Sequence, residues 1–163
     1  MSKTIYKSGY LFFLLFFVFN TSLSILSSLS LGGVRFFTNR SFSMAPAVPK
    51  GSLSMAMKFP YYDKGDIIIY RTVINNHEEI ISHRIYRIGG NVYLAKGDNN
   101  LAIDPTIILP RLIIGKVFFV IPYVGDYIAF IKSPIGLFLF IYFPASLIIL
   151  HELNKVKKYL RRL

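Results

Sequence analysis

The chain has 163 residues, enough for one modest domain, and it contains no cysteine, so disulfides, thiolate catalysis and cysteine-ligated metal sites are excluded. Hydrophobic residues make up 53% of the chain and the mean hydropathy is +0.49, values that favour a membrane protein over a soluble domain. A net charge of +11 is also found in nucleic-acid-binding proteins. Here the N-terminal tail contributes +2 and the C-terminal tail +4, and both flank apolar runs. Such flanking charge usually marks the cytoplasmic side of a membrane, so no nucleic-acid partner is expected.

Residues 9–31 form the first predicted element, a transmembrane anchor without a single charged residue. At about 1.5 Å per residue, a helix of this length crosses the roughly 30 Å hydrocarbon core. A cleaved signal peptide is the alternative, but its apolar region normally has only about 7–15 residues. We therefore expect an uncleaved anchor, preceded by a basic cytoplasmic tail over residues 1–8.

Residues 35–132 are predicted to form a small domain that is mainly β. The strand candidates are residues 66–72, 79–88, 91–95 and 112–121. Gly89-Gly90 separates the second candidate from the third, and this is a hairpin signal because both glycines can adopt positive φ. Residues 75–79 are polar and are predicted to be a loop. No long amphipathic helix pattern competes in this region.

Residues 133–150 form a second uncharged run, predicted to be a second transmembrane helix. The run is short for a span, and Pro144 is expected to kink it. A core or interfacial helix is the alternative. The basic tail over residues 151–163 suits a cytoplasmic end. If both tails are cytoplasmic, the β domain lies outside the cytoplasm, close to a cell membrane.

Three polar clusters in the middle of the chain could carry chemistry, although each has a plain structural explanation. Ser41–Pro46 begins about a dozen residues after the anchor, where serine-rich loops are common. His83 is the one histidine of three that falls in a predicted strand, and a lone strand histidine is more often structural. Asp98 and Asp104 occupy a turn rich in Gly and Asn. Two carboxylates are too few to specify a cation site, so we expect no metal and no cofactor.

Taken together, the clusters supply serine, histidine and aspartate in that order along the chain. A serine hydroxyl is a poor nucleophile until a base removes its proton; an imidazole can do so near neutral pH, and an aspartate can orient the imidazole. Lys96 and Lys116 are alternative bases. A lysine base needs burial to lower its pKa, and Lys96 is predicted to lie in a solvated turn. Histidine is therefore favoured.

Five motifs occur in a fixed order with compatible gaps. They are Ser41-Phe42-Ser43-Met44-Ala45-Pro46, His83-Arg84, Lys96-Gly97-Asp98-Asn99-Asn100 with Asp104, Gly115-Lys116-Val117 and Ile121-Pro122-Tyr123-Val124-Gly125. In this combination the chain resembles signal peptidase I, in the archaeal and endoplasmic-reticulum branch that uses histidine in place of lysine. The resemblance runs from about Phe37 to residues 132–136.

The resemblance implies roles for five residues. Ser43 matches the nucleophile, His83 the general base and Asp104 the third catalytic residue. The Ser41 hydroxyl would stabilise the oxyanion together with the Ser43 backbone N–H, and Asp98 would have a supporting role. Two positions depart from the usual pattern: Phe42 replaces a common glycine, and Ala45 replaces a common acidic residue. These departures bear on the geometry of the substrate loop more than on the reaction.

The resemblance also implies a function, a membrane-bound serine endopeptidase that removes signal peptides after a small-x-small motif. Its partners would be secretory preproteins, the lipid bilayer and the protein translocation machinery. Two alternatives stay open: a related processing peptidase for a restricted substrate, and a non-catalytic membrane scaffold with the same fold.

Overall fold

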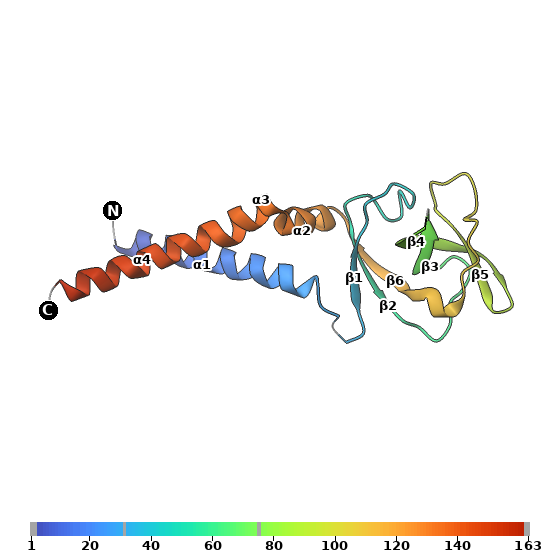
Figure 1. The fold of residues 1–163 in the computed structure, drawn as a ribbon, viewed down its shortest axis with the longest axis horizontal. Coiled ribbons are helices and arrows are strands. Elements are labelled where there is room, and N and C mark those ends of the chain that lie inside the picture. Colours follow the sequence, from blue (N-terminus) through green and yellow to red (C-terminus); the bar gives the residue numbers. More distant parts are fainter. Residues whose placement is uncertain (1–2, 31, 75, 162–163) are drawn as a thin grey trace. The chain divides into compact units, whose positions relative to one another are not determined.

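A computed structural model of the chain describes residues 3–30, 32–74 and 76–161. It divides into two compact units. The first, Met1–Ser27 with Ile128–Leu163, is helical, and the second, Ser28–Tyr127, contains the β-sheet. Figure 1 shows the order of the elements along the chain.

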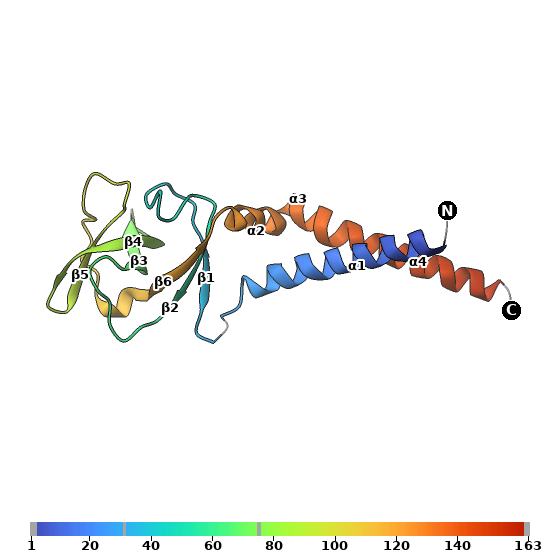
Figure 2. The same ribbon diagram turned by 180° about the vertical axis from the view of Figure 1, so that it is seen from behind.

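The helical unit consists of α1 and a long C-terminal helical segment. Its elements are α1 (Lys3–Leu26), most of α2 (Val124–Lys132), α3 (Pro134–Leu137), the π-helical turn η2 (Phe138–Tyr142) and α4 (Phe143–Leu160). Helices α1 and α4 contact each other and run side by side in Figures 1 and 2. Within the described part of the chain, one helix is long and apolar enough to cross a membrane, Pro134–Leu160; the apolar part of α1, Leu11–Ile25, is shorter.

Both expected spans differ from their predicted limits. Helix α1 ends at Leu26, before the end of the apolar run; the run's last residue lies outside the described residues. The second helix does not stop at residue 150 but continues through the basic tail to Leu160. It accommodates Pro144 through the preceding π-helical turn, in which the Phe143 amide bonds to Phe138 O. A proline has no N–H for the usual i→i−4 bond and its ring crowds that carbonyl, so a wider turn relieves the clash.

Two polar side chains of α1 donate hydrogen bonds to carbonyls of the same helix. Asn20 Nδ2 donates to Phe16 O at 2.8 Å, and Thr21 Oγ1 donates to Phe17 O at 2.9 Å. Side-chain bonds of this kind remove the cost of an unpaired polar group in an apolar environment. These two residues are therefore compatible with a membrane helix.

The second unit is built on one six-stranded sheet in which every neighbouring pair is antiparallel, in the order β1-β2-β6-β3-β4-β5. Its strands are β1 (Arg35–Thr38), β2 (Leu53–Met57), β3 (Ile67–Ile74), β4 (His77–Gly89), β5 (Val92–Lys96) and β6 (Ile113–Ile121), with the 3-10 turn η1 (Pro110–Leu112) before β6. The four predicted strands are confirmed within a few residues of their limits. The hairpin turn lies at Gly90, which has a φ of 61°.

Three features of this region differ from expectation. Strands β1 and β2 were not predicted. Residues 77–79 belong to β4 rather than to a loop, because His77 pairs with Ile74 in a longer β3–β4 hairpin. The end of the predicted β domain, after the last strand candidate, forms the helix α2.

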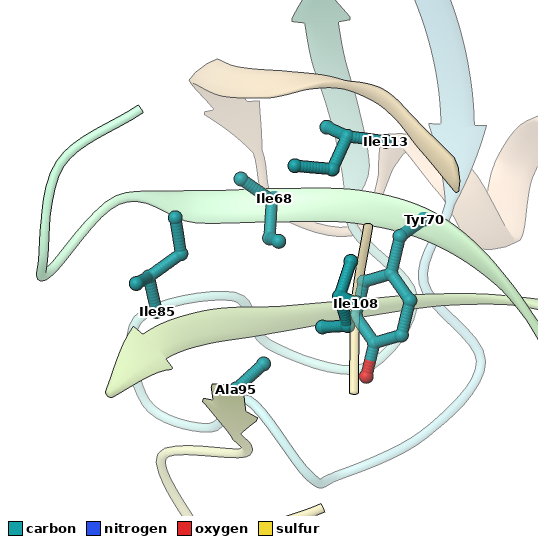
Figure 3. Close-up of a cluster of buried hydrophobic side chains, with 6 residues drawn as sticks. All are labelled: Ile68, Tyr70, Ile85, Ala95, Ile108 and Ile113. Carbon is teal, nitrogen blue, oxygen red and sulfur yellow. The ribbon is translucent and has the colours of Figure 1, made fainter. Parts of the chain in front are cut away.

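Two buried clusters lie on opposite faces of the sheet. Adjacent residues of a strand point to opposite faces, so Ile68 and Ile69 of β3 enter different clusters. The first cluster contains Ile68, Tyr70, Ile85, Ala95, Ile108 and Ile113 (Figure 3). The second contains Ala56, Ile69 and Ile114, with Phe37 and Val117 packed against it. The first cluster supports the strands that carry the polar site described below.

Two glycines of the sequence motifs allow close backbone contacts. A Cβ on Gly115 would lie 2.8 Å from Met57 O of the neighbouring strand, and one on Gly125 would lie 2.3 Å from Ser52 O. Both distances are shorter than real Cβ contacts. These glycines therefore fix how β6 and the start of α2 pack against β2 and the chain that leads into it.

Gly125→Ala is expected to lower the melting temperature of the full chain in detergent, because the added Cβ meets backbone that cannot swing aside. Overpacking of this kind typically costs about 1–3 kcal/mol. Thermal unfolding followed by circular dichroism measures the effect. Gly89→Ala is the matched control, since its Cβ would lie 3.7 Å from Val92 Cγ2. Equal melting temperatures for the two variants would contradict this packing.

Candidate active site

Ser41 and Ser43 lie in the loop between β1 and β2, and hydrogen bonds within this loop hold its shape. The Asn39 side-chain amide donates to Val48 O at 3.0 Å, and the Gly51 amide donates to Asn39 O at 2.8 Å. Met44 and Val48 are fully buried and anchor the loop to the domain. The loop therefore presents its serines on a rigid support.

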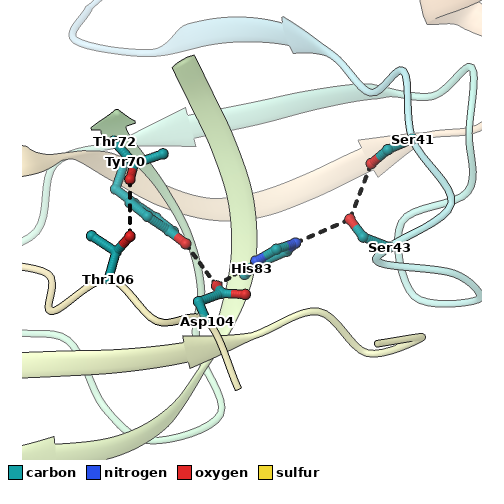
Figure 4. Close-up of polar contacts among 7 residues, drawn as sticks. All are labelled: Ser41, Ser43, Tyr70, Thr72, His83, Asp104 and Thr106. Carbon is teal, nitrogen blue, oxygen red and sulfur yellow. Dashed lines mark hydrogen bonds and ion pairs between the residues drawn. The ribbon is translucent and has the colours of Figure 1, made fainter. Parts of the chain in front are cut away.

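His83 lies on β4, where the antiparallel register places it opposite Ile68 of β3. Only 5% of the residue is exposed. Its Nε2 is 3.1 Å from Ser43 Oγ, and its Nδ1 is 2.5 Å from Asp104 Oδ2 (Figure 4). The ring therefore joins two polar groups that lie 61 residues apart in the sequence.

Asp104 reaches His83 because the segment after β5 returns along that strand. The Asp104 amide donates to Ala95 O at 2.9 Å, and Tyr93 and Ile108 exchange two backbone hydrogen bonds of 2.9 Å. The Asp104 side chain is 12% exposed. The carboxylate is thus held behind the imidazole by main-chain bonds to β5.

The Lys96-Gly97-Asp98-Asn99 turn contacts the serine loop directly. The Asn99 amide donates to Ser43 O at 2.8 Å. A Cβ on Gly97 would lie 2.7 Å from the same carbonyl oxygen. A residue larger than glycine at 97 would therefore push the Ser43 backbone away from the turn.

Asp98 lies apart from His83 and pairs with Arg84. The Arg84 Nε and Nη2 atoms donate to the two Asp98 carboxylate oxygens at 2.8 and 2.6 Å, and Arg84 Nη1 donates to Gly65 O at 2.7 Å. This bidentate contact raises the pKa of the Arg84 guanidinium. Adjacent residues of a strand point to opposite faces of the sheet. Arg84 therefore holds the Asp98 turn on one face, while His83 contacts Ser43 and Asp104 on the other.

The Ser41 hydroxyl lies beside Ser43, with 3.0 Å between the two Oγ atoms. Phe42, between them, is 62% exposed and its ring lies under Lys50 Nζ, at 5.0 Å from the centroid. The bulky residue at this unusual position thus points outward and leaves the two hydroxyls close together.

Neither alternative base approaches Ser43 in any contact of the described residues. Lys116 Nζ is paired with Asp66 Oδ1 at 2.7 Å. Lys96 is half-buried at the end of β5. The imidazole is therefore the base that the arrangement offers to the Ser43 hydroxyl.

Tyr70 is a site residue that the sequence analysis missed. Its hydroxyl donates to Asp104 Oδ2 at 2.7 Å, so this oxygen accepts from Tyr70 and contacts His83 Nδ1 (Figure 4). Burial, then the hydrogen bond to Asp104, raises the pKa of the Tyr70 phenol. Tyr70 lies two residues after Ile68, on the face that carries His83. Pairing residues 67–74 with 77–84 in register would have revealed it.

A groove of about 660 Å³ runs beside Ser41. Residues of β1, β2, β3 and β4 line it, including Phe37, Ser54, Ile69 and Ser82. Ser54 Oγ is buried and has no hydrogen-bond partner among the described residues. The groove is large enough for a few residues of an extended chain.

Comparison with known proteins does not identify a family. No protein-family model matches the chain, and a search of curated proteins finds no significant match. The geometry of the site is therefore the basis of the functional argument.

Tyr70→Phe is expected to flatten the loss of stability at alkaline pH. The folded state raises the pKa of Tyr70 above its ordinary value of 10.0, so the unfolded chain releases this proton first. The contribution of Tyr70 is complete below about pH 10 and is lost as the pH rises above that value, by up to about 1.4 kcal/mol per pH unit.

Urea unfolding between about pH 8 and 11 measures this slope in the wild type and in Tyr70→Phe. Phenylalanine cannot ionise, so the variant should show the shallower alkaline limb. Tyr61→Phe is the control, because Tyr61 is 84% exposed. The same limb in the wild type and in Tyr70→Phe would refute the buried phenol–carboxylate contact.

Proposed function

We propose that this protein is a membrane-bound serine endopeptidase of the signal peptidase I type that removes signal peptides from secretory preproteins. The observation that carries the proposal is the position of His83, within hydrogen-bond reach of Ser43 on one side and Asp104 on the other. Nucleophile, base and orienting carboxylate in mutual contact are the arrangement that serine acyl transfer requires.

The proposed reaction uses each group at a stated atom. Ser43 Oγ attacks the scissile carbonyl carbon while His83 Nε2 takes the hydroxyl proton. Asp104 Oδ2 holds the Nδ1 side of the ring and stabilises the imidazolium that forms. The imidazolium then gives its proton to the leaving amine, which leaves an acyl ester on Ser43. A water molecule, deprotonated by His83, hydrolyses the ester and restores the serine.

The Ser41 hydroxyl supports stabilisation of the oxyanion. The oxyanion is the former carbonyl oxygen of the carbon that Ser43 Oγ attacks, and Ser41 Oγ lies 3.0 Å from Ser43 Oγ. A hydroxyl there can turn toward the new negative charge, together with the Ser43 N–H. A preorganised donor of this kind is typically worth about 3–4 kcal/mol in the transition state.

Two unpaired strand edges favour an extended peptide as the substrate. Among the described residues, strand β1 pairs with β2 alone, and residues 77–83 of β4 pair with β3 but not with β5. Both segments contribute to the wall of the groove beside Ser41. A peptide can bind to such edges through its main chain and place alternate side chains in the groove.

A membrane location fits this substrate. The Pro134–Leu160 helix is long and apolar enough to span a bilayer, and signal peptides reach the enzyme as membrane-inserted segments. Tethering enzyme and substrate to one membrane raises their effective concentration. In this proposal both termini are cytoplasmic, the β domain is extracytoplasmic, and the translocation machinery is a neighbour.

Ser43→Ala and His83→Ala are each expected to lower cleavage of a model preprotein by at least about a thousandfold, since either change removes a member of the nucleophile–base pair. Gel-based cleavage by purified protein in detergent measures this. Ser146→Ala is the matched control, because it makes the same side-chain change at an exposed serine of α4 that does not line the groove. Full activity of Ser43→Ala or His83→Ala would reject the mechanism. Inactivity of the wild type on every preprotein would favour the scaffold alternative.

Single cysteines test the proposed orientation cleanly, because the chain has none of its own. Leu101→Cys, at a fully exposed position of the β unit, is expected to react with a membrane-impermeant maleimide on intact cells. Lys158→Cys in the basic tail is expected to react only after permeabilisation. Labelling of Lys158→Cys from outside, with protection of Leu101→Cys, would reverse the orientation.

A further inference from the structure

A second cavity in the β unit, of about 690 Å³, has a basic wall. Its charged lining residues are Arg35, Lys58, Arg71, Arg111 and Glu78. Within the described part of the chain, none of these four basic side chains forms an ion pair, and none is paired with Glu78. Four unpaired cations around one space repel one another and attract an anion.

This basic cavity is built on the same strands as the groove beside Ser41. Glu78 lines both, and β1 and β3 contribute to both: Phe37 and Ile69 to the groove, Arg35 and Arg71 to the cavity. The cavity lies near the N-terminal ends of β1 and β4, whereas the serine–histidine site lies beyond them along the chain. Arg35 precedes Ser41 by six residues, and Glu78 precedes His83 by five.

The spacing along β1 sets the reach of a bound chain. Arg35 precedes Ser43 by eight residues, of which only residues 35–38 are extended strand. Because the loop residues 39–43 cover less distance than the roughly 3.3 Å per residue of an extended chain, a peptide that lies along β1 with its scissile bond at Ser43 reaches the basic cavity in fewer than eight residues, about five to seven.

We propose that the basic cavity is a specificity subsite that binds an acidic side chain of the substrate, Asp or Glu, about five to seven residues from the scissile bond. The inference rests on the proposed function and narrows it to precursors with a carboxylate at that spacing. Arg35, Arg71 and Arg111 carry planar guanidinium groups, which match a carboxylate with two parallel hydrogen bonds. The continuity with the groove favours a peptide carboxylate over the phosphate of an anionic lipid.

The test uses the full chain in uncharged detergent and model preproteins that differ at one position. Glu, Gln or Lys is placed at each position from three to nine residues from the scissile bond, on either flank. We expect kcat/KM to be about fivefold higher for Glu than for Gln at five to seven residues on one flank, and lowest for Lys. Equal kcat/KM for the three residues at every position would overturn the subsite while leaving the peptidase intact.

Charge reversal locates the effect. Arg71→Glu should abolish the preference for Glu over Gln substrates. Arg87→Glu carries the same charge change at an exposed position of β4 outside the cavity and is the matched control. Lys58→Glu provides the same comparison if Arg71→Glu does not fold. A preference that survives both cavity variants would overturn the assignment to this cavity.

Binding separates this inference from the proposed function. Fluorescence anisotropy of labelled Glu and Gln substrates with Ser43→Ala should show the same preference without cleavage. A second outcome is that the wild type cleaves no substrate but still binds Glu substrates more tightly than Gln substrates, with this difference lost in Arg71→Glu. That result would support the subsite and reject the peptidase function. If the wild type shows no charge preference for peptides, but binds anionic vesicles through Arg71, the cavity is a lipid site and the inference is wrong.

Discussion

The two hydrogen bonds of the His83 ring are the constraint on which the rest of the β unit depends. A planar ring with one nitrogen toward Ser43 and the other toward Asp104 has little freedom, so both partners must be delivered within a few tenths of an ångström. The strand that carries His83 is long, and its register is fixed by pairing with β3 over residues 77–84. The loops that carry the partners are held by main-chain bonds and, in the serine loop, also by the Asn39 side-chain amide.

The need to position Ser43 and Asp104 against His83 explains why the sequence motifs contain residues that do not contact His83. Gly97 and Asn99 join the aspartate turn to the Ser43 carbonyl, and the Arg84–Asp98 pair braces the same turn from the other face. Gly125 lets α2 approach the end of the serine loop at Ser52. Each motif therefore contributes a contact between segments, and this is the physical reason why the motifs mean more together than separately.

Sequence patterns predicted the parts of the fold with strong local signals. Residues 66–72 are rich in β-branched side chains, and Gly89-Gly90 is a turn signal between the next two strands. These strands were therefore predicted. Strand β1 has four residues and pairs with β2, and β2 in turn pairs with β6, far along the chain, so neither strand is marked by a local hairpin signal. Ser43, His83 and Asp104 could be nominated from residue type and order. Tyr70 could not, because its role depends on the register between β3 and β4.

The unpaired edges of β1 and β4 carry a consequence for solubility. An open strand edge is ordinarily a template for pairing with other sheets, which leads to aggregation. Here both edges line a hollow whose wall also carries Arg40, Glu78 and Glu79, and charged side chains beside a strand edge disfavour its pairing with another sheet. The charged wall of this recess therefore opposes self-association at both edges, although no further strand of the described residues covers their main-chain groups.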